Sequence, residues 1–179
     1  MIVAVTGTPG VGKSTFARLL AKKLNAKLVR LDRWVRERGI GGPAEDGVWE
    51  VDPKQMAREF SKVAWGDAVV EGSLSHYLPS KLLSAVVVLR LHPRLLEKRL
   101  RRRGYDREKI RQNVEAEAID LILVESLERH GDLVYQLDLT GKRVEEAVEK
   151  FLRAFRRGKR VMERVDWLET LFRGGERVG

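Results

Sequence analysis

Residues 7–14 read Gly7-Thr8-Pro9-Gly10-Val11-Gly12-Lys13-Ser14, which fits the phosphate-loop pattern G-x-x-x-x-G-K-[ST] without a gap. The short apolar run at residues 2–6 predicts a buried strand before the loop. After the loop, apolar side chains recur at helical spacing, at Phe16, Leu19, Leu20 and Leu24. Strand, glycine-rich turn and helix thus follow in the order that phosphate binding requires. The alternative is a chance glycine turn before a helix.

The residue types in this loop suit a chain of phosphates. Glycines let the backbone curl so that successive N–H groups point inward, and the following helix adds the positive end of its dipole. Lys13 can reach the β- and γ-phosphates, and the hydroxyl of Ser14 can hold Mg²⁺. We therefore expect the loop to bind a nucleoside triphosphate.

Composition limits the remaining possibilities. The 179 residues suffice for one domain with a core, and the absence of cysteine excludes disulfides and thiolate metal sites. No charged-then-apolar leader precedes the first strand, and no run approaches the roughly 20 apolar residues of a membrane helix. We expect a cytoplasmic protein with no membrane partner. The formal net charge of +9 indicates RNA or an acidic partner, or only an enzyme that holds phosphates.

Strands and helices alternate along the chain. Besides residues 2–6, the apolar runs at 27–31, 67–72, 85–91 and 133–137 predict strands. Helices are expected from Pro93, over one long stretch at 106–123, and at 144–155. This alternation predicts an α/β fold with a five-stranded parallel sheet flanked by helices.

The segment between the second and third strands is too long and polar for a simple crossover. It contains a charged run at residues 32–39 and a glycine-rich turn at 39–43. Asp52 can cap a helix that begins at Pro53. We interpret the segment as a mobile insertion that holds a phosphate acceptor.

Basic residues gather between residues 98 and 112, where only Asp106 and Glu108 oppose them: Lys98, Arg99, Arg101, Arg102, Arg103, Arg107, Lys109 and Arg111. Phosphoryl transfer depends on positioning and charge neutralisation, so an arginine-rich flap over the γ-phosphate would serve it and exclude water. The alternative is a solvated helix face with a few arginines turned inward.

Other chemistry-bearing residues are fewer. Glu71 ends the third strand, where a Walker-B acid would bind a Mg²⁺-bound water, although a capping acid is the alternative. His76 is a lone loop histidine. The four tryptophans are typical of packing, with Trp34 and Trp49 beside the insertion as the candidates for base stacking.

Residues 158–179 form an addition to this domain. Val161, Val165, Leu168 and Phe172 recur at helical spacing until Gly174-Gly175 ends the pattern. The pattern predicts a helix, which either packs back on its own domain or docks onto another chain.

Residues 1–157 resemble the archaeal and eukaryotic adenylate kinase isoenzyme-six family, which are compact nucleoside monophosphate kinases. Its eukaryotic members are nuclear and also act in maturation of the small ribosomal subunit. The match includes the loop through Thr15, Val70-Glu71-Gly72, Val88-Leu89-Arg90, Arg99-Leu100, Arg103-Gly104-Tyr105, Lys109-Ile110, Asn113-Val114 and Glu117.

This resemblance implies the reaction ATP + AMP ⇌ 2 ADP with Mg²⁺. It implies that Lys13, Glu71 and Arg103 are catalytic, and that Ser14 and Glu71 hold the metal. Arg103 would lie in a lid at about residues 102–112, and Arg36 and Arg90 would meet the acceptor, whose segment spans about residues 30–53. ATP would be bound by Gly10, Val11, Gly12, Lys13, Ser14, Thr15 and Arg103.

The sequence departs from the family at Ser73, where members carry a histidine two positions after the acid, so that role passes to Ser73, to His76 or to no residue. The family is also linked to a small-subunit ribosomal protein of the uS11 type and to rRNA, which makes an ATP-driven assembly factor the second hypothesis. A small-metabolite kinase of the same fold is the third. A GTPase is disfavoured because the chain has no Asn/Thr-Lys-x-Asp motif.

Overall fold

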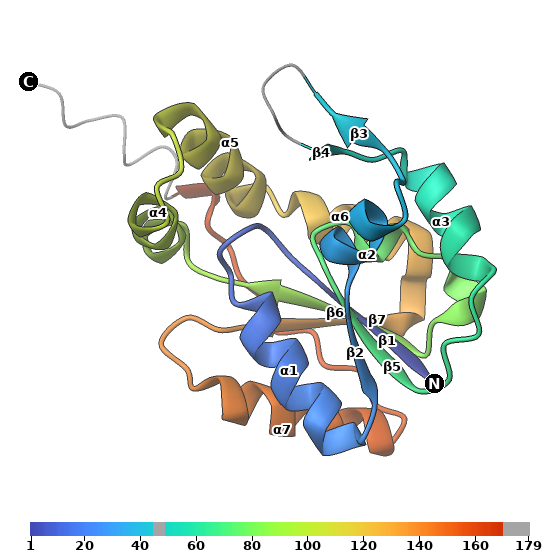
Figure 1. Ribbon diagram of the computed structural model, residues 1–179. Helices are drawn as coiled ribbons and strands as arrows, with labels where there is room; N and C mark the ends of the chain where they lie inside the picture. The colour runs from blue at the N-terminus through green and yellow to red at the C-terminus, as the bar shows by residue number, and fades with distance from the viewer. Residues whose placement is uncertain (45–48, 170–179) are drawn as a thin grey trace, which may run out of the picture.

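The computed structural model describes residues 1–44 and 49–169, and a parallel five-stranded sheet lies at its centre (Figure 1). The strands lie in the order β2-β5-β1-β6-β7. Their bounds are Ile2–Thr6 for β1, Lys27–Arg30 for β2, Ala68–Glu71 for β5, Ala85–Arg90 for β6 and Val134–Asp138 for β7. Every neighbouring pair is parallel, which confirms the predicted fold class.

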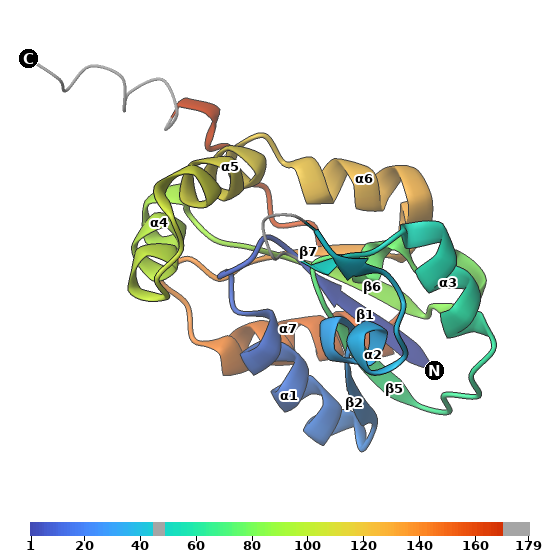
Figure 2. The ribbon, with the colours of Figure 1, turned by 45° about the horizontal axis from the view of Figure 1, so that its top comes forward.

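Both faces of the sheet are covered by helices, as the uninterrupted apolar strands require. Val3 and Val5 of β1 point into a cluster with α1 (Lys13–Leu24) and α7 (Val144–Arg156). The alternate residues of β1 join a second cluster with α2 (Leu31–Glu37), α3 (Pro53–Ser61) and α6 (Leu121–His130). Figures 1 and 2 show these two layers. Within the described ranges, no helix has the length and apolarity that crossing a bilayer takes.

The insertion after β2 contains a helix and a small hairpin. The second strand ends at Arg30 rather than at residue 31, because Leu31 opens α2 and turns into the second core cluster. The hairpin pairs β3 (Gly42–Pro43) with β4 (Trp49–Glu50) in antiparallel fashion. The predicted cap of α3 is confirmed, since the carboxylate of Asp52 accepts from the backbone N–H groups of Lys54 and Gln55 at 3.0 and 3.3 Å.

The prediction of one long helix at residues 106–123 is wrong. The chain forms α5 (Arg107–Ala118), which follows α4 (Pro93–Arg102), and then α6 as a separate helix. Asp120 between α5 and α6 has φ of +60°, a left-handed conformation that ends a right-handed helix. Its carboxylate accepts a hydrogen bond from the guanidinium of Arg90, a tertiary contact that no local sequence pattern predicts.

The prediction of a helix in the C-terminal addition is wrong for residues 158–167. Residues 161–163 are extended beside β7, where Gln136 N–H donates to Val161 O at 2.9 Å and Glu163 N–H donates to Gln136 O at 3.1 Å. The unpaired edge of β7 offers these groups, which a helix could not use. Trp167 is buried against the domain, so this segment packs on its own chain. Phe172 and Gly174-Gly175 lie outside the described residues.

Candidate active site

The loop between β1 and α1 has the backbone that its glycines allow. Gly7 and Gly10 have φ of +142° and +94°, in the region that favours glycine. A Cβ on Gly7 would lie 2.6 Å from the carbonyl oxygen of Leu89, and one on Gly10 would lie 3.0 Å from side chains of α4. The loop therefore lies tightly against β6 and α4, and only glycine fits at these two positions.

Two cations hold the loop through its carbonyl groups. Lys13 Nζ donates to Gly7 O at 2.8 Å and to Thr8 O at 3.1 Å. From α4, Arg99 Nη1 donates to the carbonyl oxygens of Gly10 and Val11 at 3.2 and 3.1 Å. A hollow of about 70 Å³ lies within the loop, lined by Gly10, Gly12, Lys13, Ser14, Thr15 and Arg103. The structure thus brings Arg103 and the other predicted ATP-binding residues to this hollow, except Val11, whose side chain is buried in the core.

Burial sets the electrostatics of this hollow. It lowers the pKa of Lys13 from 10.5 to about 8, an effect that nearby Arg103 increases and that the carboxylates of Glu71 and Glu117 oppose. Burial, followed by the charge of Arg103, also lowers the pKa of Arg99. The site therefore gathers positive charge that water does not fully solvate. A bound anion would stabilise that charge.

Ser14 and Glu71, the two residues expected to hold Mg²⁺, lie side by side at the carboxyl end of the sheet. Ser14 Oγ donates to Glu71 Oε1 at 3.1 Å, and Arg30 Nε lies 3.8 Å from the same oxygen. Glu71 is buried at the end of β5, whereas Ser14 is exposed. Mg²⁺ prefers oxygen ligands and takes most of them from waters and substrate phosphates. One hydroxyl and one carboxylate at hydrogen-bond distance therefore suit a Mg²⁺ site.

A larger cleft of about 310 Å³ extends from the loop across the carboxyl ends of the strands. Figure 1 shows α4 and α5 on one side of the loop and α2 with the β3–β4 hairpin on the other. The guanidinium of Arg36 lies 5.7 Å from the ring centroid of Trp49, whose Nε1 donates to Ile40 O at 2.8 Å. The cleft is lined by Pro9, Gly10, Lys13, Ser14, Leu31, Asp32, Val35, Arg36, Trp49, Val51, Met56, Glu71, Gly72, Ser73, Leu74, Arg103 and Tyr105.

Arg90 is not brought to this cleft, which corrects its prediction as an acceptor residue. Its side chain is 2% exposed, and its Nε donates to Glu117 Oε1 at 2.9 Å. The guanidinium also donates to Asp120 and lies over the ring of Trp167, 4.9 Å from the centroid. The sequence placed Arg90 correctly at the end of a strand, but its side chain turns into the fold because these partners surround it.

His76 and Ser73, the two candidates for the missing histidine, lie in different environments. His76 is buried, with Nδ1 2.9 Å from Thr6 Oγ1 and Nε2 3.0 Å from Glu125 Oε2, and burial lowers its pKa. Ser73 lines the cleft, and its carbonyl oxygen accepts from Thr6 Oγ1 at 3.3 Å. His76 therefore joins β1 to α6, and Ser73 is the candidate that faces the cleft.

Sequence reasoning gave no individual role to Arg99, which it named only within the basic cluster and the family match, or to Asp32 and Tyr105. Asp32 and Arg36 are four residues apart on one face of α2, and Arg99 lies four residues before Arg103, the residue that caps the end of α4. Once α4 and α2 are recognised as helices, this spacing would have predicted that Arg99 and Asp32 join their partners at the site. For Tyr105 the one sequence signal was its place in the family match Arg103-Gly104-Tyr105.

Comparison with known proteins agrees with this geometry. A family model described as an AAA domain matches residues 3–120. A protein of Thermococcus kodakarensis is 47% identical over 159 residues, covering 88% of this chain and 87% of its own. One of Methanothermobacter thermautotrophicus is 39% identical, covering 83% and 85%. Both are named "Putative adenylate kinase". The chain belongs to this family.

Solved structures show that this adenylate kinase-like family shares its fold with other phosphate-loop kinases. A shikimate kinase from Acinetobacter baumannii in complex with shikimate superposes with a TM-score of 0.62 at 16% identity, covering 88% of this chain and 94% of that one. A gluconokinase from Sinorhizobium meliloti gives 0.54 at 18% identity, with 97% of each chain covered. At such identities the likeness concerns the fold alone.

Proposed function

We propose that this protein transfers the γ-phosphoryl group of ATP to a nucleoside monophosphate, with AMP as the preferred acceptor and Mg²⁺ as the cofactor. The observation that carries the proposal is the continuous cleft that joins the phosphate loop to an apolar and aromatic wall on the insertion. The names of the 39–47% identical relatives support the same activity.

On the donor side, the loop amides and Lys13 receive the phosphates of ATP. Lys13 Nζ exchanges its carbonyl partners for phosphate oxygens, which restores the charged form that burial opposes. Ser14 and Glu71 hold Mg²⁺, which neutralises charge on the β- and γ-phosphates when bound. These residues fix the leaving group in position.

On the acceptor side, Arg36 and Trp49 are the central pair. Val35, Val51 and Met56 form an apolar wall around the Trp49 ring, which suits a purine base. Arg36 supplies a cation to the acceptor phosphate from the same wall. The insertion at residues 30–53 thereby serves as the acceptor segment.

The transfer itself needs alignment more than covalent help from the protein. An oxygen of the acceptor phosphate forms the new bond to the γ-phosphorus while the bond to the β–γ bridging oxygen breaks. Arg103 lines both the cleft and the loop hollow, so it can stabilise the charge of the transferring group. Arg103 and Tyr105 belong to the proposed lid at residues 102–112, which would exclude water.

The experiment is a coupled measurement of ADP formed from Mg-ATP with and without AMP. We expect strong dependence on AMP, and we expect Lys13→Ala to abolish turnover because it removes the cation on the transferred phosphates. Lys22→Ala on the exposed side of α1 is the matched control and should keep wild-type turnover. Near-wild-type turnover in Lys13→Ala would refute the assignment of the phosphate loop.

The second candidate is an ATPase that assists small-subunit ribosome assembly through a uS11-type ribosomal protein and rRNA. The net charge of +9 is the observation in its favour, because a basic surface attracts RNA. ATP loss that ignores AMP but changes when the ribosomal protein or an RNA fragment is added would favour this candidate over the kinase.

A further inference from the structure

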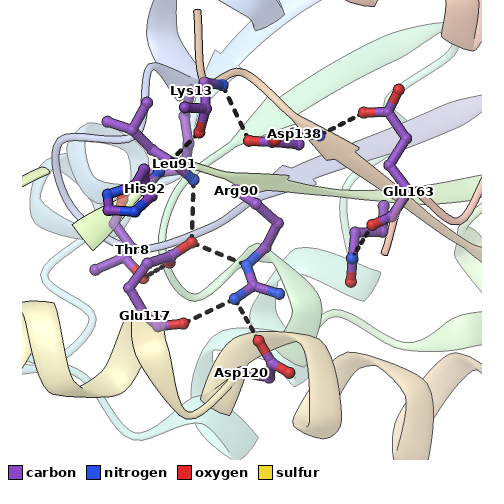
Figure 3. A network of polar contacts seen from close by, with 11 residues as sticks. Thr8, Lys13, Arg90, Leu91, His92, Glu117, Asp120, Asp138 and Glu163 are labelled. Atoms are coloured by element: carbon purple, nitrogen blue, oxygen red, sulfur yellow. Dashed lines mark hydrogen bonds and ion pairs between the residues drawn. The ribbon is translucent and has the colours of Figure 1, made fainter. Parts of the chain in front are cut away.

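A buried carboxylate lies directly behind the phosphate loop. Glu117, in the last turn of α5, is 3% exposed. Its Oε2 accepts from Thr8 Oγ1 at 2.5 Å, and its Oε1 accepts from Arg90 Nε at 2.9 Å and from Leu91 N–H at 3.1 Å (Figure 3). Three donors from the loop and from the end of β6 thus converge on one side chain.

Thr8 is the second residue of the loop, and it is fixed at both its side chain and its main chain. Its hydroxyl is bound to Glu117, while its carbonyl oxygen accepts from Lys13 Nζ at 3.1 Å and from Val11 N–H at 3.3 Å. A shift of Thr8 would therefore move the ammonium group and one of the loop amides together.

Glu117 is itself held from the side away from the loop. Arg90, which grips its carboxylate, also donates to the Glu117 carbonyl oxygen at 2.7 Å and to the carboxylate of Asp120. The Trp167 ring covers the guanidinium, whose Nη1 has no hydrogen-bond acceptor among the described residues. Figure 3 shows the resulting line of contacts from Thr8 through Glu117 and Arg90 to Asp120. The carboxylate of Glu117 is therefore held in place by Arg90 and by the Leu91 N–H group.

We propose that Glu117 is a positioning residue for phosphoryl transfer: it holds the phosphate loop in its binding conformation through Thr8 and couples the loop to α5. Because α5 begins just after Arg103 and Tyr105, one carboxylate ties the donor loop to the proposed lid. This inference rests on the proposed function, and the alternative is that Glu117 only stabilises the fold.

Thr8→Val is the decisive variant, because it removes the hydroxyl at nearly constant shape and leaves the Arg90–Glu117 ion pair intact. We expect kcat to fall roughly tenfold, as loss of a hydrogen bond to a charged group allows. We expect KM for ATP to change less, and Thr8→Ser to restore kcat because it returns the hydroxyl. Glu117→Gln removes the charge that pairs with Arg90 as well as weakening the bond to Thr8, so it should also lower the stability of the fold, which Thr8→Val should do much less.

A second readout needs no nucleotide. Hydrogen exchange of the amides at residue 8 and residues 10–13 should be faster in Thr8→Val than in the wild type, since the loop loses its anchor. Glu115→Gln, an exposed change on the same helix, is the matched control and should alter neither kcat nor exchange. Thermal unfolding of each variant shows whether it is folded at the assay temperature.

The outcomes separate the two ideas. Slower turnover with faster loop exchange, both reversed by Thr8→Ser, supports positioning by Glu117. Wild-type kcat and wild-type exchange in Thr8→Val overturn it. A drop in kcat that Thr8→Ser does not reverse, together with unchanged loop exchange, also overturns it. If the wild-type protein itself fails to transfer phosphate, the proposed function fails, while the exchange measurement still decides whether Glu117 anchors the loop.

Discussion

In the free protein, burial disfavours the charged form of the Lys13 side chain. It has two carbonyl partners in the loop, and burial brings its pKa down to about 8. Phosphate oxygens carry full negative charge, so they compensate desolvation better than neutral carbonyl groups do. The free site thus keeps a cation partly unsatisfied until an anion replaces the carbonyl oxygens.

The lowered pKa of Lys13 predicts that the protein takes up protons when ATP binds. In the free protein, Lys13 is largely deprotonated at about pH 8.5. Bound phosphates raise its pKa, so ATP binding at about pH 8.5 takes up protons. At about pH 6.5 Lys13 is charged in both the free and the bound protein, and the uptake is small. Calorimetry of Mg-ATP binding in buffers of different ionisation enthalpy measures the uptake. Lys13→Ala is the control, and equal proton uptake at both pH values would contradict the assignment.

At the scale of elements, α3 supports the acceptor wall. Met56 of α3 lines the cleft, and the helix starts at the cap made by Asp52. Asp52 accepts two backbone N–H groups that the first turn of a helix otherwise leaves without partners. The stability of the wall therefore depends partly on an exposed side chain outside the cleft.

Asp52→Ala should destabilise the protein by about 1 kcal/mol, because it removes both cap hydrogen bonds. For a domain of this size that corresponds to a fall of roughly 2–4 °C in Tm. Scanning calorimetry measures the change. Asp52→Asn keeps an accepting oxygen and should lose much less, whereas equal losses in the two variants would point to charge rather than to capping.

Arg103 caps the end of α4 and lines both the loop hollow and the cleft, whereas Arg36 lines the cleft alone. We expect Arg103→Ala to lower kcat about 100-fold, comparable to loss of one donor at a developing charge. Folding should be unaffected because the side chain is exposed. Arg101→Ala in the last turn of α4, where Arg101 pairs with exposed Glu97, is the control for lost positive charge. An unchanged kcat in Arg103→Ala would remove the lid assignment.

At the scale of the molecule, the last described segment closes the edge of the sheet. Residues 161–163 pair with Gln136 of β7, and Glu163 accepts from the backbone N–H of Asp138 at 2.7 Å (Figure 3). Trp167 covers the buried guanidinium of Arg90. The segment thereby joins the strand edge to the group of side chains behind the phosphate loop.

Deletion of residues 159–179 should therefore destabilise the domain. The loss includes the pairing with β7 and the apolar surface that Trp167 buries, together on the order of 3 kcal/mol. Urea unfolding measures the difference against a chain that ends at Glu169 and keeps the described segment whole. Trp167→Ala should reproduce part of the loss. Equal stability of the two truncated chains would mean that the segment does not hold the fold.

Local patterns predicted the parts of the site that depend on neighbours in sequence. The phosphate loop, the acid at the end of β5 and the cap of α3 each arise from a few adjacent residues. Arg36 and Arg103 line the cleft from separate elements, and the roles that the resemblance implies for them there stay predictions. The prediction that Arg90 meets the acceptor failed because its side chain is surrounded by Glu117, Asp120 and Trp167, all distant in sequence.

By itself, the sequence determined the alternation of strands and helices and the identity of the phosphate loop. Buried strands show as apolar runs, and a tight anion-binding turn requires glycines at fixed spacing. Only the tertiary structure decided where α5 ends, that residues 161–163 extend along β7, and that Arg90 faces inward. Those outcomes depend on partners far apart in the chain, because an ion pair or an unpaired strand edge can outweigh a helical pattern of a few residues.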